Sequence, residues 1–282
     1  MEDRFVYADN AATTPIDPRV LEKMMPFLTT EYGNASTLYS LGHSSHDAME
    51  EARKEVALLM NAEPSEIYFT GCGSESDNMA LRGWMHSKQN KGKKHLITTA
   101  IEHHAILHTA QALEKEGFEV TYLDVSNGHN ITAQQVKDAI RPDTCLVTTM
   151  YANNEIGSVL PIAEIGAICK EAGVVFHTDA VQAVGHISID VKELGVDMLS
   201  ASAHKFNGPK GVGFLYVNDK VKIKPILFGG GQQKDLRSGT ENVPGIAGLA
   251  KAAEVMYADL ERDLEKMYEL KQYFIDGVCE LP

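Results

Sequence analysis

The sequence predicts an α/β fold in which a mainly parallel sheet is covered by helices on both faces. The first observation is alternation: short apolar runs are separated mostly by stretches with the spacing of amphipathic helices. The second is size, because 282 residues with 44% hydrophobic side chains can bury the full core of one large domain and part of a second.

Two amphipathic helices are predicted first, over residues 18–28 and 46–62. Seven apolar runs then predict the strands of the sheet. The strands are predicted at 66–70, 95–100, 119–125, 145–152, 174–178, 196–202 and 211–217, with intervening helices at 76–89, 105–117 and 162–173.

A single long amphipathic helix is predicted after residue 244, because apolar side chains recur at helical spacing from Leu249 to Val278. An apolar stripe of this length predicts that the helix leads into a small C-terminal domain of which the sequence holds only the start. We therefore divide the chain into a large domain at 1–245 and a helix leading into a truncated domain at 246–282.

The charge of the chain excludes several partners. A net charge of −13 with scattered Lys and Arg argues against a nucleic-acid groove and against an anionic membrane surface. No apolar stretch is long enough to span a membrane, and the acidic start is unlike a secretory signal, so we expect a cytoplasmic protein. The four cysteines form no C-x-x-C pair and predict neither a disulfide framework nor a zinc site.

The loop FTGCGSESDN, which follows the strand at 66–70, has the features of a phosphate cradle. Gly71 and Gly73 expose backbone N–H groups, and Ser74 adds a hydroxyl group where a helix begins. The loop lacks the Lys of a nucleotide P-loop and the third glycine of a dinucleotide fingerprint. A plain glycine turn is the alternative interpretation.

Three histidines follow the next strand, in TTAIEHHAILH. His104 and His108 are four residues apart, but no acidic third ligand accompanies them, so no metal site is predicted. His103 is a candidate for proton transfer near neutral pH.

Asp179 and Lys205 each follow a predicted strand, 26 residues apart. Since consecutive parallel strands end at the same edge of a sheet, we expect the two side chains to be neighbours. Alone, Asp179 would be interpreted as a helix N-cap and Lys205 as a solvated surface residue. Ser202 and His204 place polar donors beside the lysine.

Together these residues match the three functional groups of pyridoxal phosphate. A phosphate needs the glycine loop, a basic ring nitrogen needs a buried carboxylate, and an aldehyde needs a lysine that forms a Schiff base.

The sequence resembles the cysteine desulfurases of the class V aminotransferase family, which are fold type I pyridoxal-phosphate enzymes. The resemblance covers the whole chain. It rests on the ordered set YADNAATTP, YGNAS, TGCGSESDN, EHHAI, YANNEIG, HTDAVQAVG, SAHKFNGPKG and LRSGTEN.

The resemblance implies a role for each residue of the site. Lys205 would bind the coenzyme covalently, Asp179 would pair with its ring nitrogen, and His103 would stack on the ring and transfer protons. Gln182 and Asn154 would approach the phenolic oxygen of the coenzyme and the substrate, and Asn34 would lie near the substrate carboxylate. The phosphate would be held by Gly73, Ser74, Ser202 and His204. Thr240 would reach the phosphate of a neighbouring subunit in a homodimer.

The family also has features that the sequence lacks. A nucleophilic cysteine on a mobile C-terminal loop and an arginine that binds the substrate carboxylate are not found, and Tyr39 stands where the family often has histidine. We therefore expect a chain that holds the coenzyme but does not complete turnover by itself.

The resemblance predicts that the full-length enzyme converts L-cysteine to L-alanine and passes sulfur as a persulfide to an acceptor or iron-sulfur scaffold protein. A selenocysteine lyase, another class V aminotransferase-type enzyme and a non-catalytic docking module for sulfur acceptors are the alternatives. A nicotinamide oxidoreductase is disfavoured because the glycine loop lacks its fingerprint.

Overall fold

The computed structural model describes residues 5–125 and 130–281, and a seven-stranded sheet forms the centre of this part of the chain. The strands are β1 (Ile67–Thr70), β2 (His95–Thr99), β3 (Glu119–Leu123), β4 (Thr144–Met150), β5 (Val175–Asp179), β6 (Met198–Ser202) and β7 (Gly213–Val217). Their order across the sheet is β1-β7-β6-β5-β4-β2-β3. β7 runs antiparallel to both of its neighbours and all other pairs are parallel, which confirms the prediction of a mainly parallel sheet.

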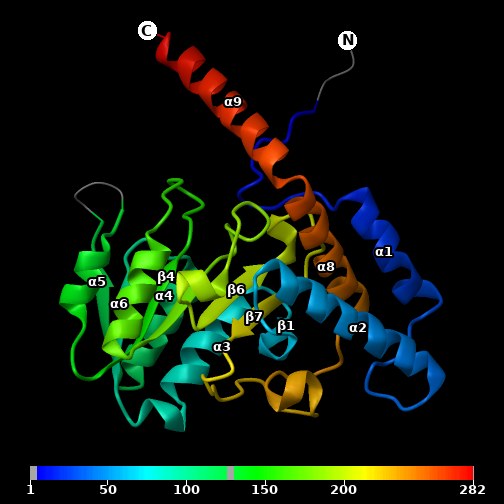
Figure 1. Ribbon diagram of the computed structural model, residues 1–282, viewed down its shortest axis with the longest axis horizontal. Helices are drawn as coiled ribbons and strands as arrows, with labels where there is room; N and C mark the ends of the chain where they lie inside the picture. The colour runs from blue at the N-terminus through cyan, green and yellow to red at the C-terminus, as the bar shows by residue number, and fades with distance from the viewer. Residues whose placement is uncertain (1–4, 126–129, 282) are drawn as a thin grey trace.

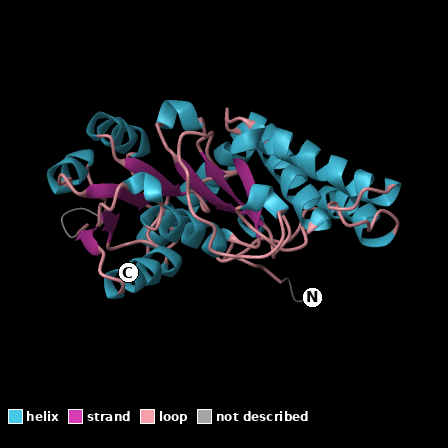
Figure 2. Ribbon diagram, turned by 90° about the horizontal axis from the view of Figure 1, so that it is seen from below, coloured by secondary structure: helices cyan, strands magenta, loops and turns pink. Residues whose placement is uncertain are grey.

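Helices cover both faces of this sheet, as Figure 2 shows. The α-helices are α1 (Pro18–Thr29), α2 (Ser40–Leu59), α3 (Gly73–Met85), α4 (His104–Lys115), α5 (Ala133–Ala139), α6 (Ile162–Ala172), α7 (Val191–Leu194), α8 (Val243–Ala258) and α9 (Leu260–Cys279). The short helix at 133–139 was not predicted. It begins with a capping box between Thr132 and Gln135, which satisfies backbone donors that so short a helix would otherwise leave unpaired.

Two apolar clusters lie on opposite faces of the sheet because successive strand residues point in opposite directions. On β4, Leu146 belongs to the cluster that includes Trp84 of α3. Its neighbour Val147 belongs to the cluster that includes Ile165 of α6. Burial of both faces explains why β4, with the sequence TCLVTTM, has no charged residue and no strict alternation of apolar and polar side chains.

The predicted single helix after residue 244 is divided in two, which corrects the prediction. α8 ends at Ala258, and Asp259 leaves the helical conformation with φ −105° and ψ 4°. Its carboxylate pairs with Arg262 at 3.0 Å, at the start of the next helix. Aspartate favours helix ends because its side chain bonds to nearby groups in non-helical conformations.

The two helices have different surroundings. α8 packs against α1 and α2, and Leu249 is fully buried there. α9 has no buried residue and extends away from the sheet toward the C-terminus (Figure 1). The division at residue 245 into two domains stays a prediction. No helix within 5–125 or 130–281 is both long and apolar enough to cross a bilayer.

The loops that leave β1, β2, β4, β5 and β6 meet at one edge of the sheet. β2, β4, β5 and β6 are parallel, and β1 points the same way because β7 is antiparallel to both β1 and β6. Ligands of open α/β sheets bind at the carboxyl ends of the strands, so a ligand site is expected at this edge.

Candidate active site

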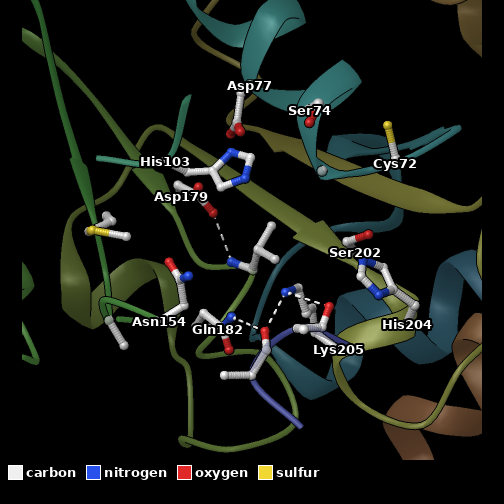
Figure 3. Close-up of a pocket in the computed structure, with 16 residues that line it drawn as sticks. Cys72, Ser74, Asp77, His103, Asn154, Asp179, Gln182, Ser202, His204 and Lys205 are labelled. Atoms are coloured by element: carbon white, nitrogen blue, oxygen red, sulfur yellow. Dashed lines mark hydrogen bonds between the residues drawn. The ribbon is translucent and has the colours of Figure 1, made fainter. Parts of the chain in front are cut away.

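A pocket of about 290 Å³ lies at this edge (Figure 3). Its volume is close to the smallest that small-molecule sites usually have. All of the predicted coenzyme residues except Thr240 line it, namely Gly73, Ser74, His103, Asn154, Asp179, Gln182, Ser202, His204 and Lys205.

One end of the pocket is formed by the start of α3. A β-carbon on Gly73 would lie 2.6 Å from Cγ2 of Val181 and 3.4 Å from Cβ of Ser202, so only glycine fits this approach. The free backbone N–H groups at the beginning of a helix attract anions, and Ser74 adds its hydroxyl group. This end of the pocket can therefore hold a phosphate.

The N-terminal segment is fastened to the loop that follows β6. Thr14 donates its backbone N–H to the carbonyl oxygen of His204 at 2.9 Å, and Nδ1 of His204 lies 3.1 Å from Oγ1 of Thr13. Burial lowers the pKa of His204, and the neighbouring charges of Lys205 and Lys210 lower it further. His204 thus contributes a neutral ring beside the phosphate end.

Lys205 is held by backbone carbonyl groups of the same segment. Its Nζ donates to the carbonyl oxygen of Ala11 at 2.5 Å and to that of Ala12 at 3.0 Å. Gln182 donates to the Ala11 oxygen as well, at 2.9 Å. Burial lowers the pKa of Lys205, although the negative charge of Asp179 opposes this effect. A lysine whose ammonium form is disfavoured is suited to act as a nucleophile and base.

Asp179 ends β5 and is 5% exposed. Its Oδ1 accepts the backbone N–H of Val181 at 2.9 Å in an Asx turn. Residues 181–186 form turns rather than a helix, so the alternative interpretation of Asp179 as a helix N-cap is wrong. Its other carboxylate oxygen accepts no hydrogen bond from the residues that the structure describes. One oxygen thus orients the carboxylate, and the second is available to a basic nitrogen in the pocket.

Two opposing effects act on the pKa of Asp179. Burial raises this pKa above its ordinary value. The Val181 N–H, His103 and Lys205 oppose the effect of burial only in part, so the carboxylate has a donor and two basic neighbours.

His103 caps the start of α4, because its Nδ1 accepts the backbone N–H of Ala105 at 3.1 Å. The proton of the neutral ring is therefore on Nε2. The loop before it is anchored by Glu102, whose Oε1 accepts the hydroxyl group of Thr99 at 2.6 Å and the backbone N–H of Met150 at 3.0 Å. Glu102 does not line the pocket, so it is a positioning residue that acts through the loop before His103. It was not predicted from the sequence.

Two predicted site residues lie outside the pocket of this chain. Thr240 is exposed, and Asn34 forms a turn in which its Oδ1 accepts the backbone N–H of Ser36 at 2.9 Å. Their neighbours Ser36 and Glu241 line the same second cavity, of about 500 Å³. The roles of Thr240 and Asn34 stay predictions.

The pocket also contains residues that the sequence analysis did not select as site residues. Asp77 follows Ser74 by three residues and so shares its face of α3, a spacing that could have indicated it. The remaining additions are Ala11, Ala12, Cys72, Met150, Ala152 and Val181.

These residues fit pyridoxal phosphate. The donor set at the start of α3 suits a phosphate, the free oxygen of the buried Asp179 suits a protonated ring nitrogen, and Lys205 suits an aldehyde. A β-carbon at position 73 would crowd Val181 and Ser202, which line the same pocket.

The comparison with known families assigns the class of protein. Residues 6–282 match the family described as aminotransferase class-V, and the chain belongs to this family, whose chemistry depends on pyridoxal phosphate.

Within this family the similar proteins are cysteine desulfurases. Cysteine desulfurase IscS of Methanosarcina thermophila is 50% identical over 281 residues, which are 100% of this chain and 69% of that protein. Putative cysteine desulfurase IscS 1 of Bacillus subtilis is 49% identical over 271 residues, or 96% of this chain and 71% of that protein.

Solved structures of cysteine desulfurase-like proteins have the same fold as this chain. A NifS-like protein superposes with a TM-score of 0.94 at 41% identity, over 98% of this chain and 76% of that one. A structure described as SspA in complex with cysteine has a TM-score of 0.86 at 44% identity, over 89% of this chain and 72% of that one. These comparisons confirm the predicted fold and the prediction of a pyridoxal-phosphate enzyme of the cysteine desulfurase type.

Proposed function

We propose that this chain provides the coenzyme and amino-acid site of an enzyme that converts L-cysteine to L-alanine and transfers the sulfur to a cysteine thiolate. The observation that supports this most directly is that Lys205, Asp179 and the start of α3 meet in one pocket. The likeness to a structure that contains cysteine supports the choice of substrate.

Each residue of the pocket would have a distinct task. Gly73, Ser74, Ser202 and His204 would bind the phosphate, and Asp179 would pair with the ring nitrogen. When bound, pyridoxal phosphate supplies a ring that withdraws electrons and stabilises negative charge on the α-carbon of an amino acid.

Lys205 would take the α-proton of the substrate. Its Nζ is held by the carbonyl groups of Ala11 and Ala12, and its lowered pKa favours the neutral base. Gln182 and Asn154 would orient the substrate from the neighbouring wall. His103, with its proton on Nε2, would move a proton at the substrate sulfur.

The sulfur step requires a thiolate close to the substrate. An S–S bond forms as the C–S bond breaks, the electrons of that bond stay on carbon, and carbon then takes a proton to give alanine. Burial raises the pKa of Cys145 to about 11 and that of Cys169 to about 12, so neither is a good nucleophile. Among the described residues no arginine lines the pocket, and Cys72 is its one cysteine.

A homodimer with shared sites is part of this proposal. Thr240 is exposed and lies away from its own pocket, as expected for a residue that serves a neighbouring subunit. Mixing Lys205→Ala chains with Thr240→Ala chains would restore tight coenzyme binding in one of the two sites of each mixed dimer. A Thr240 that acted within its own subunit would give no recovery.

The central test locates the coenzyme. Borohydride reduction of the loaded protein, followed by peptide mass analysis, should find the label on Lys205, and Lys205→Ala should lose the coenzyme absorbance. A label on another lysine would refute the assignment. Product analysis with L-cysteine and L-selenocysteine would separate the desulfurase from a selenocysteine lyase.

The sulfur acceptor, which we propose to be an iron-sulfur scaffold or thiolation protein, would be tested by transfer of labelled sulfur. The cytoplasmic location stays a prediction that cell fractionation would test.

A further inference from the structure

Asp77 is a second buried carboxyl group in the coenzyme pocket. It lies on α3, one turn after Ser74, with its side chain 2% exposed. It lines the same pocket as Asp179, and in Figure 3 the two carboxyl groups flank the ring of His103. Two carboxylates that share one buried site repel each other, so the pair favours a state with a single negative charge.

The hydrogen bonds distinguish the two carboxyl groups. Asp179 accepts the N–H of Val181, whereas Oδ1 of Asp77 has no hydrogen-bond partner in the part of the chain that the structure describes. A buried carboxylate oxygen without a donor loses its solvation without compensation, which favours the protonated form.

The nearest basic group does not supply a positive charge. Nε2 of His177 lies 3.9 Å from Oδ1 of Asp77, but it is hydrogen-bonded to Oγ of Ser200 at 2.9 Å. Nδ1 of the same ring lies 2.8 Å from Oγ1 of Thr148. Burial lowers the pKa of His177 to about 3, so the ring is neutral.

The other groups that act on Asp77 are acidic. They come from three directions: Asp179 from β5, Glu102 from the loop before α4, and Cys72 from the loop before α3. Burial and these neighbours raise the pKa of Asp77 well above its ordinary range, and the Ser200 hydroxyl group opposes this only in part. Two basic side chains of the site, His103 and Lys205, act on Asp179.

We propose that Asp77 is a positioning residue that stays protonated in the coenzyme site, so that the negative charge of the pair is confined to Asp179. A cation bound in the pocket is then attracted to a single anion, the carboxylate of Asp179. The protonated Asp77 fills the space beside it with a neutral polar group and keeps water away from Asp179.

The first test uses the coenzyme-free chain and infrared spectroscopy with isotope-labelled aspartate. We expect the carbonyl band of a protonated carboxyl group at neutral pH in the native chain and in Asp179→Asn, and its loss in Asp77→Asn. Absence of this band from the native chain at neutral pH would overturn the proposal. Since no coenzyme is present, this result is independent of the proposed function.

The second test measures coenzyme affinity and the pH dependence of the coenzyme absorbance. Asparagine has the shape and neutrality of a protonated aspartic acid, so Asp77→Asn should keep the affinity within about twofold, whereas Asp179→Asn should weaken it by about tenfold or more, or 1.4 kcal/mol. Asp77→Ala opens space for water beside Asp179, so it should shift the pH at which the coenzyme absorbance changes.

The outcomes of the second test separate the alternatives. An Asp77→Asn chain that binds the coenzyme as weakly as Asp179→Asn would overturn the proposal, because Asp77 would then act as an anion. An Asp77→Ala chain that matches the native titration would equally overturn it, because a residue without effect on Asp179 positions nothing. Thermal unfolding of each variant shows whether it is folded.

Discussion

At Gly73 the start of α3 approaches Val181 so closely that no side chain fits. Gly73→Ala would place a β-carbon 2.6 Å from Cγ2 of Val181, and we expect a loss of about 1–3 kcal/mol in the free energy of unfolding. Coenzyme affinity should fall as well, because α3 must move away from the phosphate end. Denaturant unfolding and coenzyme titration measure the two effects.

Gly277 in α9 provides a matched control. A β-carbon there meets nothing within 4 Å, so Gly277→Ala should be neutral or stabilise the helix by up to about 1 kcal/mol. Equal effects at both positions would contradict the steric argument.

Glu102, the residue before His103, should make the stability of the fold depend on pH. Burial raises the pKa of Glu102 to about 8, whereas the value in an unfolded chain is about 4.3. Between these pH values the folded state binds the additional proton, so its stability decreases as the pH rises. Glu102→Gln keeps an acceptor for Thr99 and Met150 but cannot titrate.

The expected result is a difference in slope. From about pH 5 to about pH 8, the free energy of unfolding of the native chain should fall more steeply than that of Glu102→Gln, by up to about 1.4 kcal/mol per pH unit. Urea unfolding at a series of pH values measures both slopes. Parallel curves would show that Glu102 is ionised in the folded chain.

At the scale of elements, an ion pair joins the phosphate loop to the segment that carries Thr240. Nε of Arg237 lies 2.6 Å from Oε1 of Glu75, and Oε2 of Glu75 accepts the backbone N–H of Gly71 at 2.8 Å. Both side chains are mostly buried, at 20% and 22% exposure, so solvent screens the pair less than a surface pair.

A double-mutant cycle with Glu75→Gln and Arg237→Gln should give a coupling energy of about 1–3 kcal/mol in unfolding. The more exposed pair of Lys251 and Glu254 on α8 serves as the control, and we expect about 0.5 kcal/mol or less. Amide exchange at Gly71 should accelerate in both single variants. Additive single effects would mean that the pair does not couple the two loops.

At the scale of the whole molecule, the coenzyme should stabilise the fold. The pocket is built from loops after five different strands, so it exists only in the folded chain. With pyridoxal phosphate at 100 times its dissociation constant, the free energy of unfolding should rise by about 2.7 kcal/mol, and removing the coenzyme should reverse the change. Calorimetry with and without the coenzyme measures it.

Pyridoxal without the phosphate group is the control ligand. It lacks the group that the start of α3 would bind, so at the same concentration it should raise the unfolding temperature less than pyridoxal phosphate does. An equal shift would mean that the phosphate end of the pocket makes no contribution.

The sequence by itself determined the strands, the parallel alternation and most of the pocket. These features are local: an apolar run predicts a strand, and residues at the carboxyl ends of parallel strands share an edge. Lys205 and Asp179 were found in this way. The resemblance to cysteine desulfurases added their chemical roles.

Only the tertiary structure decided which helix is buried and where the charge of the pocket lies. One continuous apolar pattern predicted one helix, but α8 is buried against α1 and α2, while α9 has no buried residue. The pKa of Asp77 and that of Glu102 depend on burial and on neighbours distant in sequence, such as Asp179. Periodicity describes one segment at a time, whereas burial and electrostatic coupling are properties of segments packed together.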